Sequence, residues 1–177
     1  DLAEMPAKHF HGVRIAVARD AAFSFIYRDN IRFLEHLGAE IIYFSPINDK
    51  KTPDGINGLM LFGGYPELFA EKLSENRSMM QSIKEKIKSG LPIIAECGGF
   101  MYLHDALAID DKHTYPMVGV IPGKAFPTAK LQRFGYVRLY AKENNLLCNK
   151  NEELLAHEFH YWDSENCGSG FKAVKES

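Results

Sequence analysis

Hydrophobic positions along this chain of 177 residues follow two periods that alternate through its first half. Short apolar runs, which are typical of buried strands, are separated by stretches with helical spacing. Gly38 and Gly90 follow two of the helical stretches, where a glycine often ends a helix. The predicted strands are residues 13–18, 40–44, 58–62 and 92–95, and the predicted helices are residues 30–37, about 79–87 and about 98–107. This order of elements predicts an α/β fold with a mainly parallel open sheet and helices on both faces.

The pattern changes after about residue 115. Residues 117–121, 131–140 and 154–161 have strand character, with no helical stretch between them. Strands that follow one another without a helix are typical of antiparallel pairing. We therefore expect an antiparallel extension of the sheet in the C-terminal half. Residues 1–12 are interpreted as a tail or linker, and residues 13–177 as one domain.

Composition and charge narrow the function classes. The chain has 21 Lys and Arg against 23 Asp and Glu, a formal net charge of −2. Proteins that bind nucleic acid usually carry a basic surface, so no nucleic-acid partner is expected. No apolar stretch approaches the ~20 residues that cross a membrane, and the first residues do not resemble a signal peptide. The cysteines, Cys97, Cys148 and Cys167, lack metal-binding spacing, so we expect free thiols, no metal, no membrane partner and a cytoplasmic location.

Cys97 has the most informative sequence context. An apolar strand ends just before it, and Gly98 and Gly99 follow at once. A nucleophile at a strand-to-helix turn needs small neighbours because the backbone passes close by. The N–H groups at the start of the following helix lower the pKa of a thiol and bind an oxyanion. The alternative interpretation is a structural cysteine followed by a glycine turn, which we favour for Cys148 and Cys167.

A second glycine pair, Gly63 and Gly64, also ends an apolar strand and precedes Pro66, a residue suited to the first turn of a helix. Ligands of open α/β sheets bind outside the carboxyl ends of the strands. The N–H groups of this pair are therefore expected to face the same crevice as Cys97. By itself, the pattern also fits an ordinary loop.

Two histidines, His157 and His160, lie in the last predicted strand. Residues three apart in a strand point to opposite faces, so one metal ion does not take both. Glu158 shares a face with His160, which is the candidate base for Cys97. Residues 119–125 resemble a phosphate-binding loop but have one residue too few between the glycines and Ala125 where Ser or Thr is needed. We therefore expect no nucleotide cofactor in this domain.

Together, these segments resemble the C-terminal class I glutamine amidotransferase domain of the cobyrinate a,c-diamide synthases. The resemblance runs from about Arg14 to Tyr161, and its most specific parts are Gly-Gly-Tyr-Pro-Glu at 63–67, Glu-Cys-Gly-Gly at 96–99 and His-Glu-Phe-His at 157–160. It implies a flavodoxin-like sheet and a glutaminase that supplies ammonia in cobalamin synthesis. It also implies that Cys97 is the nucleophile and His160 its base, with Gly63, Gly64 and Gly98 forming the oxyanion hole or binding glutamine.

The chain departs from the wider glutaminase pattern at Trp162, where many class I members carry a glutamate. The resemblance implies a Cys-His pair, because this branch of the family also lacks that glutamate, and Glu158 and Asp163 remain candidates for an orienting acid. It further implies an N-terminal synthetase domain that binds ATP, Mg²⁺ and cobyrinate before the linker at 1–12, and a family domain that continues past residue 177. On this basis we expect the chain to be a domain that is truncated at its C-terminal end.

Three alternatives share these residues. An ammonia-donating domain for another tetrapyrrole, such as nickel-sirohydrochlorin, would carry the same motifs. A different Cys-His hydrolase, such as a peptidase, would not prefer glutamine. A non-catalytic docking domain would tolerate Cys97→Ala without loss of function.

Overall fold

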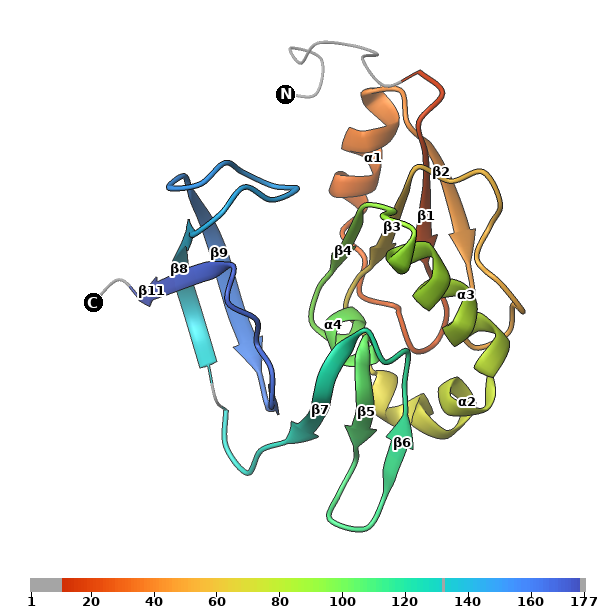
Figure 1. Ribbon diagram of the computed structural model, residues 1–177, viewed down its shortest axis with the longest axis vertical. Helices are drawn as coiled ribbons and strands as arrows, with labels where there is room; N and C mark the ends of the chain where they lie inside the picture. Colours follow the sequence, from red (N-terminus) through yellow and green to blue (C-terminus); the bar gives the residue numbers. More distant parts are fainter. Residues whose placement is uncertain (1–10, 132, 176–177) are drawn as a thin grey trace.

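The computed structural model describes residues 11–131 and 133–175. Figure 1 shows a body built on a parallel sheet with its helices, and a small sheet of three strands beside it. Apart from His11 and Gly12, the predicted linker at residues 1–12 lies outside the described residues, so its role stays a prediction.

Four parallel strands form the central sheet, and the sequence predicts all four with nearly the same bounds. They are β1 (Arg14–Ala18), β2 (Glu40–Phe44), β3 (Gly58–Leu61) and β4 (Ile93–Ala95), in the order β2-β1-β3-β4. The chain leaves β1 toward one edge of the sheet and leaves β3 toward the other. The carboxyl ends of β1 and β3 therefore form the switch point at which open α/β sheets bind their ligands.

Helices cover both faces of this sheet, as the sequence predicts. They are α1 (Arg28–His36), the 3-10 helix η2 (Pro66–Phe69), α2 (Ala70–Glu75), α3 (Arg77–Lys88) and α4 (Gly98–Tyr102). On one face, Val17 packs with Ile31 of α1. On the other face, Ala16 belongs to a larger core cluster that includes Met79 and Ile83 of α3. The alternation along β1 thus supplies an apolar residue to each layer.

The remaining strands form two further sheets. They are β5 (His104–Ala108), β6 (Thr114–Pro116), β7 (Ile121–Pro127), β8 (Arg133–Ala141), β9 (Glu153–His160), β10 (Trp162–Ser164) and β11 (Phe171–Lys175). The order in one sheet is β10-β7-β5-β6 and in the other β11-β8-β9. All pairs are antiparallel except β5 with β7. The predicted antiparallel strands are present, but they pair among themselves and do not lengthen the central sheet.

Two expected element bounds are wrong. The helix predicted for 98–107 ends at Tyr102, and residues 104–108 form β5. His104 is fully buried, and its ring hydrogen-bonds to Phe100 O (2.9 Å) and Ser164 Oγ (2.6 Å). These contacts with other segments end the helix earlier than the apolar residues of 98–107 predict.

The strand predicted for 117–121 is also wrong. Met117 and Val118 are buried, but their N–H groups donate to Asp105 O and Tyr102 O outside any strand ladder. Gly119 turns the chain with φ +71°, so only Ile121 enters a strand, at the start of β7.

Candidate active site

Cys97 lies in a sharp turn between β4 and α4. Its φ is +49° and its ψ is −113°, a conformation that costs an ordinary residue free energy and that clusters at functional sites. Gly99 explains why the turn needs small residues, because a Cβ there would lie 2.0 Å from the backbone oxygen of Leu61. The residue Cys97 itself is exposed. The turn therefore lies at the carboxyl edge of the sheet, where part of Cys97 reaches solvent while its sulfur is partly desolvated.

The structure brings both glycine pairs to this thiol. A Cβ added to Gly63 would lie 3.5 Å from Cys97 Cβ and 3.8 Å from Cys97 Sγ. A Cβ added to Gly98 would lie 2.7 Å from Pro66 Cδ and 3.3 Å from the backbone nitrogen of Gly64. The loops after β3 and β4 are thus in van der Waals contact, and their roles as an oxyanion hole stay a prediction.

The surroundings of Cys97 act on its pKa in opposite directions. Desolvation is the largest effect and raises the pKa, and the negative charges of Glu67 and Glu96 raise it further. The backbone N–H groups of Gly98 and Gly64 face the sulfur and lower the pKa, but the net change is upward. The thiol is therefore mostly protonated at neutral pH and needs a base.

His160 ends β9, and its Nδ1 lies 2.6 Å from the backbone oxygen of Trp162. When Nδ1 carries the proton and donates to that oxygen, Nε2 is left to accept a proton. His157 points to the opposite face, where its ring contacts Phe134 and Tyr136, as strand alternation predicts. Among the described residues, no hydrogen bond joins His160 to Cys97 Sγ. The structure thus places the two predicted catalytic residues on different sheets.

The two candidate orienting acids have other partners. Glu158 lies 3.4 Å from Arg133, and Asp163 accepts a hydrogen bond from the backbone nitrogen of Ser164. In the part of the chain that the structure describes, neither acid bonds to His160. The group on Nδ1 is the Trp162 carbonyl, which sequence reasoning missed because a main-chain oxygen leaves no signal in the residue pattern.

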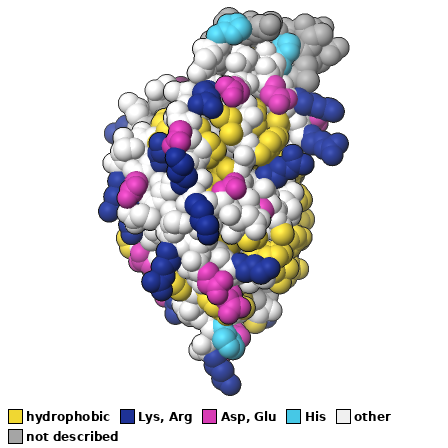
Figure 2. Space-filling model, turned by 90° about the vertical axis from the view of Figure 1, so that its right-hand side faces the viewer, with side chains coloured by type: hydrophobic (Ala, Val, Ile, Leu, Met, Phe, Trp, Pro, Cys, Tyr) yellow, Lys and Arg dark blue, Asp and Glu magenta, His cyan; other side chains and the backbone are white. Residues whose placement is uncertain are grey.

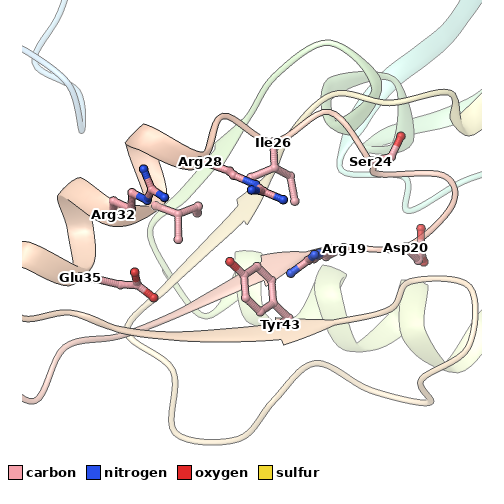
Figure 3. Close-up of a pocket in the computed structure, with 9 residues that line it drawn as sticks. Arg19, Asp20, Ser24, Ile26, Arg28, Arg32, Glu35 and Tyr43 are labelled. Carbon is pink, nitrogen blue, oxygen red and sulfur yellow. The ribbon is translucent and has the colours of Figure 1, made fainter.

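A second feature that the sequence did not reveal is a basic cavity of about 730 Å³ at the carboxyl ends of β1 and β2. In Figure 3, Arg28 and Arg32 extend from α1, and Arg19 lies beside Tyr43, with 4.8 Å between its Cζ and the ring centroid. Within residues 11–131 and 133–175, Arg19 and Arg28 form no ion pair. Asp20, in the chain segment directly after β1, also lines this cavity.

In the described part of the chain, surface charge, metal-ligand groups and helix length do not point to a further site. On the face shown in Figure 2, Lys and Arg side chains are interspersed with Asp and Glu. The described residues contain no group of three or more His, Cys, Asp or Glu placed to hold a metal ion. None of the described helices has the length and apolar character needed to span a membrane.

Comparison with known proteins defines the class. The sequence profile of the CobB/CobQ-like glutamine amidotransferase domain family matches residues 14–169. The chain therefore belongs to this family and is a glutamine amidotransferase domain, which is an enzyme.

Its curated relatives are named cobyrinate a,c-diamide synthases. The relative from Caldanaerobacter subterraneus is 47% identical over 149 residues, that from Clostridium tetani 49% over 148, and that from Picrophilus torridus 47% over 154. The matches cover 84%, 84% and 87% of this chain, but 33%, 33% and 34% of the relatives. The chain thus spans about a third of the length of these relatives.

Solved structures agree on the fold. PurLQS from Thermotoga maritima superposes with a TM-score of 0.61 at 19% identity, over 93% of this chain and 76% of that chain. The crystal structure of a glutamine amidotransferase gives a TM-score of 0.58 at 15% identity, over 87% of this chain and 75% of that chain. These likenesses confirm the predicted α/β, flavodoxin-like fold class of glutamine amidotransferases.

Proposed function

We propose that this domain hydrolyses glutamine to glutamate and ammonia through a thioester on Cys97. The observation that carries the proposal is the strained turn at Cys97, where both glycine pairs lie beside the thiol and the N–H groups of Gly64 and Gly98 favour the thiolate. Two donors that converge beside a thiol suit the oxyanion of an acyl-transfer intermediate. The curated relatives, whose name describes amide formation, support the same chemistry.

The reaction balances with the groups present. The Cys97 thiolate attacks the side-chain amide carbon of glutamine, and the carbonyl oxygen takes the negative charge beside Gly64 and Gly98. The C–N bond then breaks, and the nitrogen leaves as ammonia with the proton that the thiol gave up. Water attacks the thioester, releases glutamate and restores the thiol. Removal of one oxyanion donor in such sites costs about 10²- to 10³-fold in kcat.

His160 is the proposed carrier of that proton. Its Nδ1 bond to the Trp162 oxygen fixes the ring and leaves Nε2 for the transfer. Catalytic hydrogen bonds are often long or absent without substrate and tighten when the substrate is bound. A Cys-His pair is therefore proposed, with Glu158 acting only indirectly through its bond to Arg133.

The ammonia would serve an ATP-dependent amidation of the a and c carboxylates of cobyrinate. The relatives carry about two thirds of their length outside the matched region, and a synthetase domain in that part would bind ATP, Mg²⁺ and cobyrinate. This domain would then contribute glutamine binding and no cofactor. Such an activity fits a cytoplasmic enzyme.

The test is glutamate release from glutamine by the chain alone, and after addition of the synthetase portion of a relative with ATP, Mg²⁺ and cobyrinate. We expect slow release that the additions increase, complete dependence on Cys97, and no change in Cys148→Ala, the matched control for loss of a thiol. Release that survives Cys97→Ala would refute the proposal. Nickel-sirohydrochlorin in place of cobyrinate tests the alternative substrate.

A further inference from the structure

Asp20, directly after β1, uses both carboxylate oxygens in hydrogen bonds. Oδ1 accepts from the backbone nitrogens of Ala22 (2.9 Å) and Phe23 (3.2 Å). Oδ2 accepts from Ser45 Oγ (2.9 Å) and from the backbone nitrogen of Ile47 (2.9 Å). One half-buried side chain therefore fixes the turn after β1 and ties it to the loop after β2.

The turn that Asp20 fixes packs directly against the glycine loop, which contains Gly63 and Gly64. The backbone nitrogen of Tyr65 donates to Ala22 O (2.9 Å), and that of Phe25 donates to Gly63 O (3.1 Å). A Cβ on Gly64 would lie 2.1 Å from Ala22 O. These contacts bracket the peptide whose N–H faces Cys97, so the position of the turn decides where that N–H points.

The same turn also packs on the helix that follows the nucleophile. The rings of Phe23 and Tyr102 lie 5.4 Å apart, and both side chains are completely buried. Tyr102 is the last residue of α4, which begins directly after Cys97. The turn thus contacts both the donor loop and the helix of the thiol, the two parts whose relative position matters for an oxyanion hole.

We infer that Asp20 is a positioning residue of this site: through the turn at 20–25 it holds the Gly64 N–H toward Cys97 Sγ. The assignment of a catalytic consequence rests on the proposed function, whereas the geometric effect on the thiol does not. The Asp20 carboxylate bonds to the turn and to the loop after β2 and not to the sulfur, so its effect is indirect.

In Asp20→Asn, a loss of positioning and a loss of direct electrostatic interaction would shift the pKa of the Cys97 thiol in opposite directions. Each carboxylate oxygen of Asp20 accepts hydrogen bonds from two donors, so the NH₂ group of an asparagine would face two donors whichever way the amide is turned. The turn then loses two of the hydrogen bonds that hold it. A displaced Gly64 N–H no longer stabilises the thiolate, which raises the thiol pKa. Loss of a negative charge alone would lower that pKa. Glu67 and Glu96, the acids whose charges act on Cys97, stay in place.

The experiment measures alkylation of Cys97 by iodoacetamide between neutral and alkaline pH, in the full chain with Cys148→Ser and Cys167→Ser. Asp20→Asn is compared with this parent and with Asp110→Asn. Asp110 is a matched control, because its carboxylate likewise accepts two backbone N–H groups in a turn, at Lys112 and His113, far along the chain from the glycine loop. Circular dichroism and thermal unfolding establish that each variant is folded.

We expect the alkylation midpoint of Asp20→Asn to rise by about half a pH unit or more, and that of Asp110→Asn to stay unchanged. We also expect glutaminase kcat to fall by about tenfold with little change in KM, because an oxyanion donor acts mainly in the transition state. An unchanged or lowered midpoint in folded Asp20→Asn overturns the inference.

If Asp20→Asn does not fold, Ser45→Ala takes its place, because it removes one donor to Oδ2 and is expected to shift the midpoint upward by less. An unchanged midpoint in folded Ser45→Ala overturns the inference as well. A parent without glutaminase activity would refute the proposed function, while the alkylation result would still decide the role of Asp20.

Discussion

The carboxyl edge of the parallel sheet and the three-stranded sheet that carries His160 differ in how tightly they are packed. Around Cys97, each glycine loop lies so close to neighbouring backbone that a single methyl group would collide with a main-chain oxygen, that of Ala22 for Gly64 and that of Leu61 for Gly99. On the three-stranded sheet, one face remains open, with Phe134, Tyr136 and Phe159 exposed by 60%, 75% and 57%. Both regions carry a residue that the proposed reaction needs.

This difference assigns different physical roles to the two regions. The proposed nucleophile and its proposed oxyanion donors are held by main-chain packing, so their geometry exists before substrate binds. His160 is held mainly by the pairing of β8 with β9 and by one bond to the Trp162 oxygen. Substitutions near Cys97 should therefore change both stability and catalytic rate. Substitutions on the three-stranded sheet should change mostly one of these two properties.

The largest effect is expected at the nucleophile. Cys97→Ser should reduce glutamate release by about 10⁴-fold or more, because a catalytic nucleophile acts as one unit with its base. The protein should stay folded, since the side chain is exposed. A steady-state glutaminase assay together with circular dichroism measures both.

The same thiol gives a prediction for pH. A chloroketone analogue of glutamine should label Cys97 and spare Cys148 and Cys167, as peptide mass mapping would show. Because the Cys97 pKa is raised from its usual value of 9.0, thiolate is scarce at neutral pH, and labelling should accelerate with each pH unit up to and beyond pH 9. A rate that levels off below pH 8 would contradict this assignment.

The next effect separates the two histidines. His160→Ala should lower kcat by about 10²- to 10⁴-fold, the usual contribution of general acid-base catalysis. His157→Ala, on the opposite face of β9, should lower it by less than about threefold, because that ring packs against Phe134 and Tyr136, away from His160. Equal losses in folded variants would reverse the assignment.

A smaller effect concerns stability at the tight turn. Gly99→Ala should destabilise the fold by about 3 kcal/mol, since its Cβ would lie 2.0 Å from Leu61 O and overpacking outweighs any gain in helix propensity. Gly58→Ala is the control: its Cβ would lie 3.8 Å from Pro92 O, and we expect a change within about 1 kcal/mol. Urea unfolding of both variants measures the difference. Similar values for the two would show that the turn relaxes.

The smallest effect is expected on the open face of the three-stranded sheet. Phe159→Ala should cost about 0.5–1 kcal/mol, the value of a cross-strand aromatic pair, because its ring lies 5.8 Å from Phe134. Leu155→Ala on the same face should cost less, since Leu155 is 71% exposed. A loss near that of Gly99→Ala would mean that this sheet is as tightly packed as the edge around Cys97.

Local patterns in the chain were enough to predict the parallel α/β layer and the turn at Cys97. The signals are apolar alternation at β1, helical spacing at Met79 and Ile83, and glycines where the backbone has no room for a Cβ. The alternation of His157 and His160 follows in the same way from the two-residue repeat of a strand. Such signals survive without knowledge of distant partners.

Which segments meet depends instead on long-range contacts. Helix α4 ends at Tyr102 because His104 is buried between Phe100 and Ser164, and the C-terminal strands pair among themselves. His160 has a main-chain partner, and the glycine loop is set on the turn held by Asp20. These features are hydrogen bonds that form only in the folded chain, and their energy depends on a geometry that no local pattern encodes.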